Sequence, residues 1–159
     1  MKKIFYLLMM SVVLFMQACG PKQENKAKAV QETPAVQTVE FKIAKNYFFN
    51  NNAEIPENPI VSTQVDFERL YGMAAVMGKD GMPTPIDFGK EFVIGIVLPI
   101  TNDNTEIIPE TLVKEGDVLT LNYKLNIIER DMSWSMRPMA LIVVDRNYLA
   151  KTCLLKESK

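Results

Sequence analysis

Hydrophobic and polar residues alternate between positions 119 and 127, and this alternation is the clearest structural signal in the chain. A period of two predicts a half-buried antiparallel strand. Residues 105–114 lie on the other side of Glu115 and Gly116, so the two segments are predicted to form a hairpin. The side of the second arm expected to face the core consists of Leu119, Leu121, Tyr123, Leu125 and Ile127.

Several other segments are predicted to be strands. Residues 92–98 and 139–144 are apolar almost throughout, which is typical of strands covered on both faces. Alternation from Val39 into an aromatic run predicts the first strand over 39–49, and residues 152–156 form a short last one. Hairpins and loops connect these segments, so we expect an α+β domain of mostly antiparallel β-sheet, or a small β-sandwich, with one short helix.

A short helix is expected, capped by Ser62 or Thr63. The spacing of Thr63 and Asp66 resembles a capping box with aspartate in place of glutamate. Gly72 is well placed to end the helix. Its buried side is expected to come from Val65, Leu70 and either Phe67 or Tyr71.

The N-terminus has the organisation of an export signal. Lys2 and Lys3 precede the apolar residues 4–16, and Ala18 then stands before Cys19. Residues 1–18 resemble a bacterial lipoprotein signal peptide, and this resemblance implies that Cys19 carries the lipid. The apolar run makes a helix of only about 20 Å, which is short for a bilayer core of about 30 Å. Plain secretion with an incidental cysteine is the alternative.

Residues 19–38 are predicted to form the lipidated cysteine and a disordered tether, ahead of a single β-rich globular domain over 39–159. The tether is rich in Lys, Glu, Gln, Ala and Pro and lacks aromatic residues, so it cannot offset its ordering entropy by burial. Gly20 does not resemble the aspartate that retains many lipoproteins at the inner membrane. We therefore expect a lipid-anchored protein of the bacterial cell envelope, on the outer membrane, with the periplasm-facing position favoured over the cell surface.

Composition and charge weigh against several classes of function. The formal net charge is −1 and no basic stripe is present, so we expect no nucleic-acid partner. The chain contains no histidine, which excludes Ser-His-Asp and Cys-His catalytic arrangements. Cys153 stands alone in the domain, and we interpret it as a small buried hydrophobic residue rather than a nucleophile.

The remaining candidates for chemistry are carboxylates and oxygen ligands. Asp66, Asp87 and Glu91 could form a carboxylate pair, but a helix cap for Asp66 and solvated turn positions for the other two explain them better. Residues 101–106 offer hard oxygen ligands that suit calcium, yet they lack the glycine and the spacing of an EF-hand. We therefore expect no enzymatic activity, no cofactor and no metal.

Residues 130–139 are the strongest candidate for a binding surface. They contain the only tryptophan of the chain, and Met132, Trp134 and Met136 alternate with polar residues. Trp and Arg are enriched at interface hot spots, so Trp134, Met132, Met136 and Arg137 are predicted to bind a protein partner. The alternative is an edge strand whose apolar side chains cap the core.

A second, reserve surface is predicted around Tyr47 and Phe49. Together with Phe48 these residues form an aromatic run. Consecutive residues of a strand point to opposite faces, so the three side chains cannot all face the core.

Several short motifs resemble one family. Ile60-Val61-Ser62 leads into a short helix ending at Tyr71-Gly72. Then Pro85-x-Asp87-Phe88-x-Lys90 runs into an apolar strand, and Arg137-Pro138 precedes another. Over about residues 39–157 this order resembles the C-terminal domain of the B subunit of dentilisin-type protease complexes. Residues 99–104 depart from the pattern, because they lack the glycine-rich stretch expected there.

The resemblance implies a non-enzymatic role: binding, stabilising or restraining another envelope protein, such as a protease. It supplies no catalytic residues. Our leading prediction is therefore a lipid-anchored binding module for a protein partner in the cell envelope. With ten methionines and eight phenylalanines in the chain, a carrier of small apolar ligands remains an alternative, as does a structural lipoprotein without a dedicated partner.

Overall fold

The computed structural model describes residues 35–75, 77–78 and 80–158. The predicted signal peptide, Cys19 and most of the predicted tether lie outside these residues. The described part is a mostly antiparallel β-fold with one short α-helix, as the sequence predicted.

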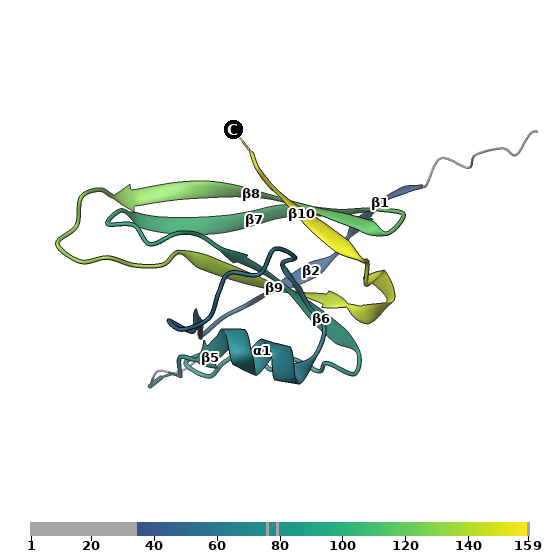
Figure 1. The fold of residues 1–159 in the computed structure, drawn as a ribbon, viewed down its shortest axis with the longest axis horizontal. Coiled ribbons are helices and arrows are strands. Elements are labelled where there is room, and N and C mark those ends of the chain that lie inside the picture. Colours follow the sequence, from purple (N-terminus) through teal and green to yellow (C-terminus); the bar gives the residue numbers. More distant parts are fainter. Residues whose placement is uncertain (1–34, 76, 79, 159) are drawn as a thin grey trace, which may run out of the picture. The chain divides into compact units, whose positions relative to one another are not determined.

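The strands form two four-stranded sheets and a two-stranded one. The outer sheet has the order β1 (Val36–Val39), β7 (Asn104–Glu115), β8 (Val118–Glu129), β10 (Thr152–Glu157). The central sheet has the order β2 (Phe41–Ala44), β9 (Met139–Asp145), β6 (Glu91–Val97), β4 (Ile60–Val61). Beyond it lie the remaining elements, β3 (Tyr47–Phe49), β5 (Tyr71–Met73) and α1 (Gln64–Leu70). Figure 1 shows the outer sheet on one side of the central sheet, with α1 and β5 on the other.

The two middle strands of the central sheet, β6 and β9, are buried on both faces, which confirms the prediction from their continuous apolar sequences. Along β6, Phe92 and Ile94 pack in a core cluster with outer-sheet residues such as Leu119. Val93 packs in a second cluster with Phe67 of α1. A strand covered from both sides gains from apolar residues at every position, so period-two alternation is absent from β6.

The predicted β7–β8 hairpin is also confirmed. Glu115 pairs with Val118, and Gly116 has φ +56°, a left-handed conformation that glycine adopts without steric cost. Tyr123 is buried as expected, but Ile127 on the same side of the strand is 40% exposed. The prediction that Ile127 faces the core is therefore wrong at the distal end of β8, where the core no longer covers the strand.

The predicted first strand is three strands, and the ordered domain begins earlier than predicted. β1 starts at Val36, inside the predicted tether, and pairs antiparallel with residues 112–115 of β7. Only Val39 of β1 is buried. The segment is held by backbone pairing rather than by apolar burial, so the hydrophobic pattern did not reveal it.

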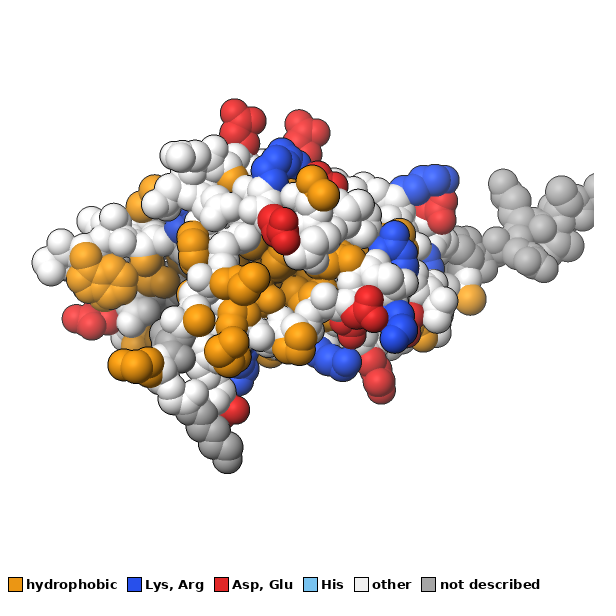
Figure 2. Space-filling model, turned by 90° about the horizontal axis from the view of Figure 1, so that it is seen from below, with side chains coloured by type: hydrophobic (Ala, Val, Ile, Leu, Met, Phe, Trp, Pro, Cys, Tyr) orange, Lys and Arg blue, Asp and Glu red, His pale blue; other side chains and the backbone are white. Residues whose placement is uncertain are grey.

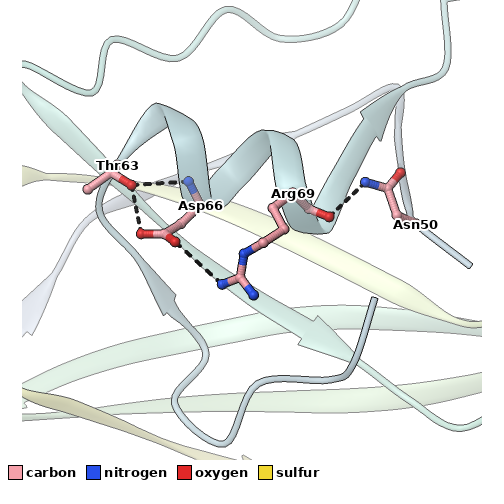
Figure 3. A network of polar contacts seen from close by, with 4 residues as sticks. All are labelled: Asn50, Thr63, Asp66 and Arg69. Carbon is pink, nitrogen blue, oxygen red and sulfur yellow. Dashed lines mark hydrogen bonds and ion pairs between the residues drawn. The ribbon is translucent and has the colours of Figure 1, made fainter. Parts of the chain in front are cut away.

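The helix begins as predicted, and Figure 3 shows its polar contacts. The Thr63 hydroxyl accepts a hydrogen bond from the Asp66 N–H (3.1 Å) and donates one to the Asp66 carboxylate (2.7 Å). Asp66 also forms an ion pair with Arg69 (3.4 Å). At the other end, the Asn50 side-chain amide donates to the Arg69 carbonyl (2.9 Å), which satisfies a carbonyl of the last helical turn.

Two expectations about the helix were wrong. Val65 is exposed, while Phe67 and Leu70 form the buried side. Gly72 does not end the helix, because α1 stops at Leu70 and Gly72 lies in β5 opposite Phe48. A Cβ at position 72 would lie 2.3 Å from the Phe48 ring, so glycine allows this ring to cross β5 closely.

The last strand is the exception to the antiparallel pattern. β10 pairs parallel with β8, with Thr152 opposite Val118. The chain reaches it from β9 of the central sheet through a short 3₁₀ helix, η1 (Arg146–Tyr148). Cys153 of β10 is buried, as the sequence predicted.

Candidate functional site

The candidate site lies at the open end of the β7–β8 hairpin, where β7 begins and β8 ends, opposite the Glu115–Gly116 turn. We call this end of the domain the tip. It consists of residues 98–103, residues 127–138 and the start of β7. Main-chain hydrogen bonds join its two loops. Thr101 and Met136 exchange N–H···O bonds of 2.9 Å in both directions, and the Met132 N–H donates to the Asn102 carbonyl (2.9 Å). The backbone of the tip is therefore fixed by the protein itself.

The Asp103 carboxylate organises the turn that leaves β8. It accepts hydrogen bonds from the Asp131 N–H (3.1 Å) and from the Arg130 guanidinium (3.4 Å). Asp131 has φ +53°, a left-handed conformation that aspartate adopts more readily than most residues. Within the described residues no group of three or more acidic or cysteine side chains is arranged to hold a metal ion. The Asp103 oxygen atoms accept hydrogen bonds from two residues of the turn itself.

The predicted contact residues of the tip differ in exposure. Trp134 is 53% exposed, whereas Met132, Met136 and Arg137 are half-buried. The sequence left open whether this segment caps the core or faces solvent. In the structure neither methionine packs against the two core clusters, and half of the Trp134 indole is accessible.

Two further residues belong to the tip surface and were missed from the sequence. Ile100 is exposed on the loop after β6, and Ile128 is exposed near the end of β8. The register shifts at this point, because Glu129 faces Asn104 and Ile127 faces Thr105, so Ile128 has no direct partner. A bulge of this kind changes where a side chain points, and strand alternation alone does not reveal it. In Figure 2 a few apolar side chains lie at the end of the domain where these loops lie in Figure 1, and a larger group lies toward the middle of the face that carries α1 and β5.

The reserve surface predicted around Tyr47 and Phe49 is corrected by the structure. Phe49 is buried in the core and cannot serve as a contact residue on the surface. Tyr47 is half-buried, with its ring edge-on to Phe67 and its hydroxyl donating to the Thr84 carbonyl (2.7 Å). Phe48, between them, is the exposed residue, because the β3–β5 pairing turns it away from the core.

The remaining titratable candidates have structural roles. Burial raises the pKa of the Cys153 thiol to about 11, so at neutral pH the thiol is protonated and unreactive. Asp66 lies in the first turn of α1 and accepts a hydrogen bond from the hydroxyl of Thr63, the N-cap residue, so it belongs to the capping arrangement rather than to a carboxylate pair. The Asp87 carboxylate accepts from the Gly89 N–H (2.9 Å), and Glu91 accepts from the Asp87 N–H (3.1 Å). These two side chains stabilise the turn before β6.

One surface hollow of about 650 Å³ lies beside the C-terminal end of α1. It is lined mainly by polar side chains, among them Asn50, Asn51, Asn52 and Arg69. An apolar ligand requires the opposite lining, since apolar contacts supply most of its binding energy. This hollow therefore does not suit a carrier of apolar molecules.

The protein is a layered β-domain with exposed apolar residues at the tip, where main-chain hydrogen bonds hold the two loops together. No helix within the described residues is long and apolar enough to span a membrane. Comparison of the chain with family models, curated proteins and solved structures finds no match.

Proposed function

We propose that this chain is a lipid-anchored protein of the bacterial cell envelope whose domain binds a protein partner through the tip. The observation that carries the proposal is the 53% exposure of Trp134 on a loop whose backbone is held by hydrogen bonds to a second loop. An ordered aromatic residue can bind with little loss of conformational entropy. Ile100 and Ile128 are further exposed apolar residues of the tip.

A protein partner fits this surface better than a small molecule does. The tip presents protruding apolar side chains, whereas small-ligand sites are concave. Exposed apolar residues gathered at one end of a domain mark interaction surfaces more often than isolated ones do. The resemblance to the C-terminal domain of dentilisin-type B subunits favours the same class of partner, an envelope protein such as a protease, and a non-enzymatic role.

The anchor is part of the proposal. Acylation of Cys19 would confine the domain to the envelope, with the outer membrane and its periplasmic side favoured. Metabolic labelling with a palmitate analogue tests this step. We expect incorporation into the full chain and none into a Cys19→Ser variant; equal labelling of both would contradict the anchor.

The binding role is tested by crosslinking in intact cells, followed by identification of the proteins captured with the chain. We expect Trp134→Ala to reduce capture of the main partner by about thirtyfold or more, because truncating a hot-spot residue costs about 2 kcal/mol or more. Val65→Ala is the matched control, since Val65 is also an exposed apolar residue but lies on α1. The same partners captured in the same amounts with a folded Trp134→Ala variant would refute the assignment of the tip.

A further inference from the structure

The polar hollow beside the C-terminal end of α1 has no part in the binding role of the tip. Its volume of about 650 Å³ lies within the range of about 300–1,000 Å³ that is typical of ligand sites. The lining comes from one turn of the chain and from the last turn of the helix: Asn50, Asn51, Asn52, Ala53, Glu54 and Arg69. The only apolar residue among them is an alanine, so the hollow does not suit an apolar ligand.

Hydrogen bonds hold the two walls of this hollow together. The Asn50 N–H donates to the Leu70 carbonyl (2.9 Å), and the Asn50 carbonyl accepts from the Ala53 N–H (3.0 Å). The Asn50 side-chain amide donates to the Arg69 carbonyl (2.9 Å), as Figure 3 shows. The turn is therefore fixed against the helix before any ligand binds, which lowers the entropy cost of binding.

The polar groups that line the hollow both donate and accept hydrogen bonds. Asn51 and Asn52 are exposed, and each amide offers two donors and an acceptor oxygen. Glu54, also exposed, adds acceptors. The Arg69 side chain is 69% exposed and adds guanidinium donors, although one of them pairs with Asp66 (3.4 Å). The lining thus combines neutral amides with one positive and one negative charge.

We propose that this hollow binds a neutral oligosaccharide. Sugar hydroxyls donate and accept hydrogen bonds without carrying charge, so they match a lining of amides, one carboxylate and one guanidinium. An anionic ligand would be repelled by Glu54, and a cationic ligand would be repelled by Arg69. A neutral ligand forms hydrogen bonds with both.

An exposed aromatic ring adds a second contact of the kind that sugars use. Phe48 is 48% exposed and lies two positions before Asn50, about 7 Å away along extended backbone. Phe49 between them is buried, so strand alternation places Phe48 and Asn50 on the same side of the chain. The apolar C–H faces of sugar rings pack against aromatic rings, so an oligosaccharide longer than the hollow can extend toward Phe48.

The ligand class is tested by NMR titration of the purified full chain with two matched pairs of trisaccharides. The first pair is triacetylchitotriose and its deacetylated, cationic form, and the second is maltotriose and its sulfated, anionic form. We expect at least one neutral trisaccharide to bind about fivefold or more tightly than its charged counterpart, because each charged form meets a like charge in the hollow.

Variants of the lining test the site. Asn51→Ala combined with Asn52→Ala is expected to weaken binding of the neutral trisaccharide about tenfold, because two amides lose their hydrogen bonds to it. Asn126→Ala, at an exposed asparagine of β8, is the matched control and is expected to change nothing. Glu54→Gln retains an acceptor but removes the negative charge. It is expected to leave neutral binding within about twofold and to strengthen binding of sulfated maltotriose about fivefold or more.

Three results would overturn the proposal. They are no binding of either neutral trisaccharide, tighter binding of both charged forms, and unchanged binding by an Asn51→Ala, Asn52→Ala variant with the thermal midpoint of the wild type. Trp134→Ala is expected to bind the trisaccharide normally, since Trp134 does not line the hollow. Failure of sugar binding and failure of partner capture by the tip are therefore separate outcomes.

Discussion

Arg137 lies over the ring of Phe49, with its guanidinium carbon 5.6 Å from the ring centroid. The pair connects the last residues of the tip loop to the layer formed by β3, β5 and α1. Phe49 is buried, so Arg137 covers one edge of the core while its charge remains partly accessible. A residue that the sequence suggested as a partner contact thus also has a role in stability.

Replacing Arg137 tests that role. We expect Arg137→Met to lower the free energy of unfolding by about 0.5–1 kcal/mol, the range for a cation–π contact that is not fully desolvated. Urea unfolding of the single variants and of the double variant with Phe49→Leu measures the coupling between the two side chains. Additive effects within about 0.3 kcal/mol would mean that the ring and the guanidinium do not interact.

Gly95 and Tyr71 form a second testable pair. A Cβ at position 95 would lie 2.0 Å from the Tyr71 hydroxyl oxygen, so Gly95→Ala is expected to destabilise the domain by about 1–3 kcal/mol through overpacking. The Tyr71 hydroxyl is buried and has no hydrogen-bond partner within the described residues. Tyr71→Phe is therefore expected to raise the free energy of unfolding by about 1 kcal/mol.

The double variant provides the internal control for this pair. Tyr71→Phe removes the oxygen that an alanine at position 95 would meet, although the Tyr71 ring carbon remains 3.0 Å away. We therefore expect Gly95→Ala to cost less in the Tyr71→Phe background than in the wild type. An equal cost in both backgrounds, measured by urea unfolding, would show that the hydroxyl is not the source of the clash.

The cap of α1 is expected to contribute measurable stability. Thr63→Ala removes the acceptor for the Asp66 N–H and should lower the free energy of unfolding by about 1 kcal/mol. Thr63→Ser retains the hydroxyl and should lose much less. Thermal unfolding of both variants tests the capping role. If the two variants lost the same stability, the loss would come from substitution at this site in general and not from the missing hydroxyl.

The turn before β6 is expected to make stability depend on pH. Hydrogen bonds from the Gly89 N–H and from Lys90 lower the pKa of Asp87. A carboxyl whose pKa is lower in the folded state stabilises the fold at pH values above its ordinary pKa, and this contribution is lost as the pH falls through the folded-state value. Thermal midpoints of the wild type and of Asp87→Asn should therefore differ at about pH 7 and converge at about pH 2. A difference that grows on acidification would contradict the sign of the shift.

Local patterns predicted the elements that depend on near neighbours. Thr63 and Asp66 are three positions apart in the chain, so their mutual hydrogen bonds form wherever the helix forms. The alternation in β8 correctly placed Tyr123 in the core. It failed at Ile127, since the covering layer ends before that residue. Periodicity shows which residues share a side, but not how far the opposing surface extends.

The candidate site was only partly predictable, because the exposure of its residues depends on strand pairing and on covering layers that lie far away in the sequence. Trp134 was found because its residue type is unusual within a polar loop. Ile128 depends on a shift in the pairing of β7 and β8, which leaves no mark in the composition. Phe48 and Phe49 have the same chemistry, and only the pairing of β3 with β5 decides which of them faces solvent.

The sequence by itself determined the β-rich fold class, the helix cap and the hairpin, because each follows from contacts between residues close in the chain. The sequence also contains no histidine, so it offers no residue for Ser-His-Asp or Cys-His catalytic arrangements. The tertiary structure decided which faces are covered, that β10 runs parallel to β8, and that Trp134 remains half exposed. These properties depend on packing between segments far apart in the chain, where burial is set by the opposing layer rather than by the residue itself.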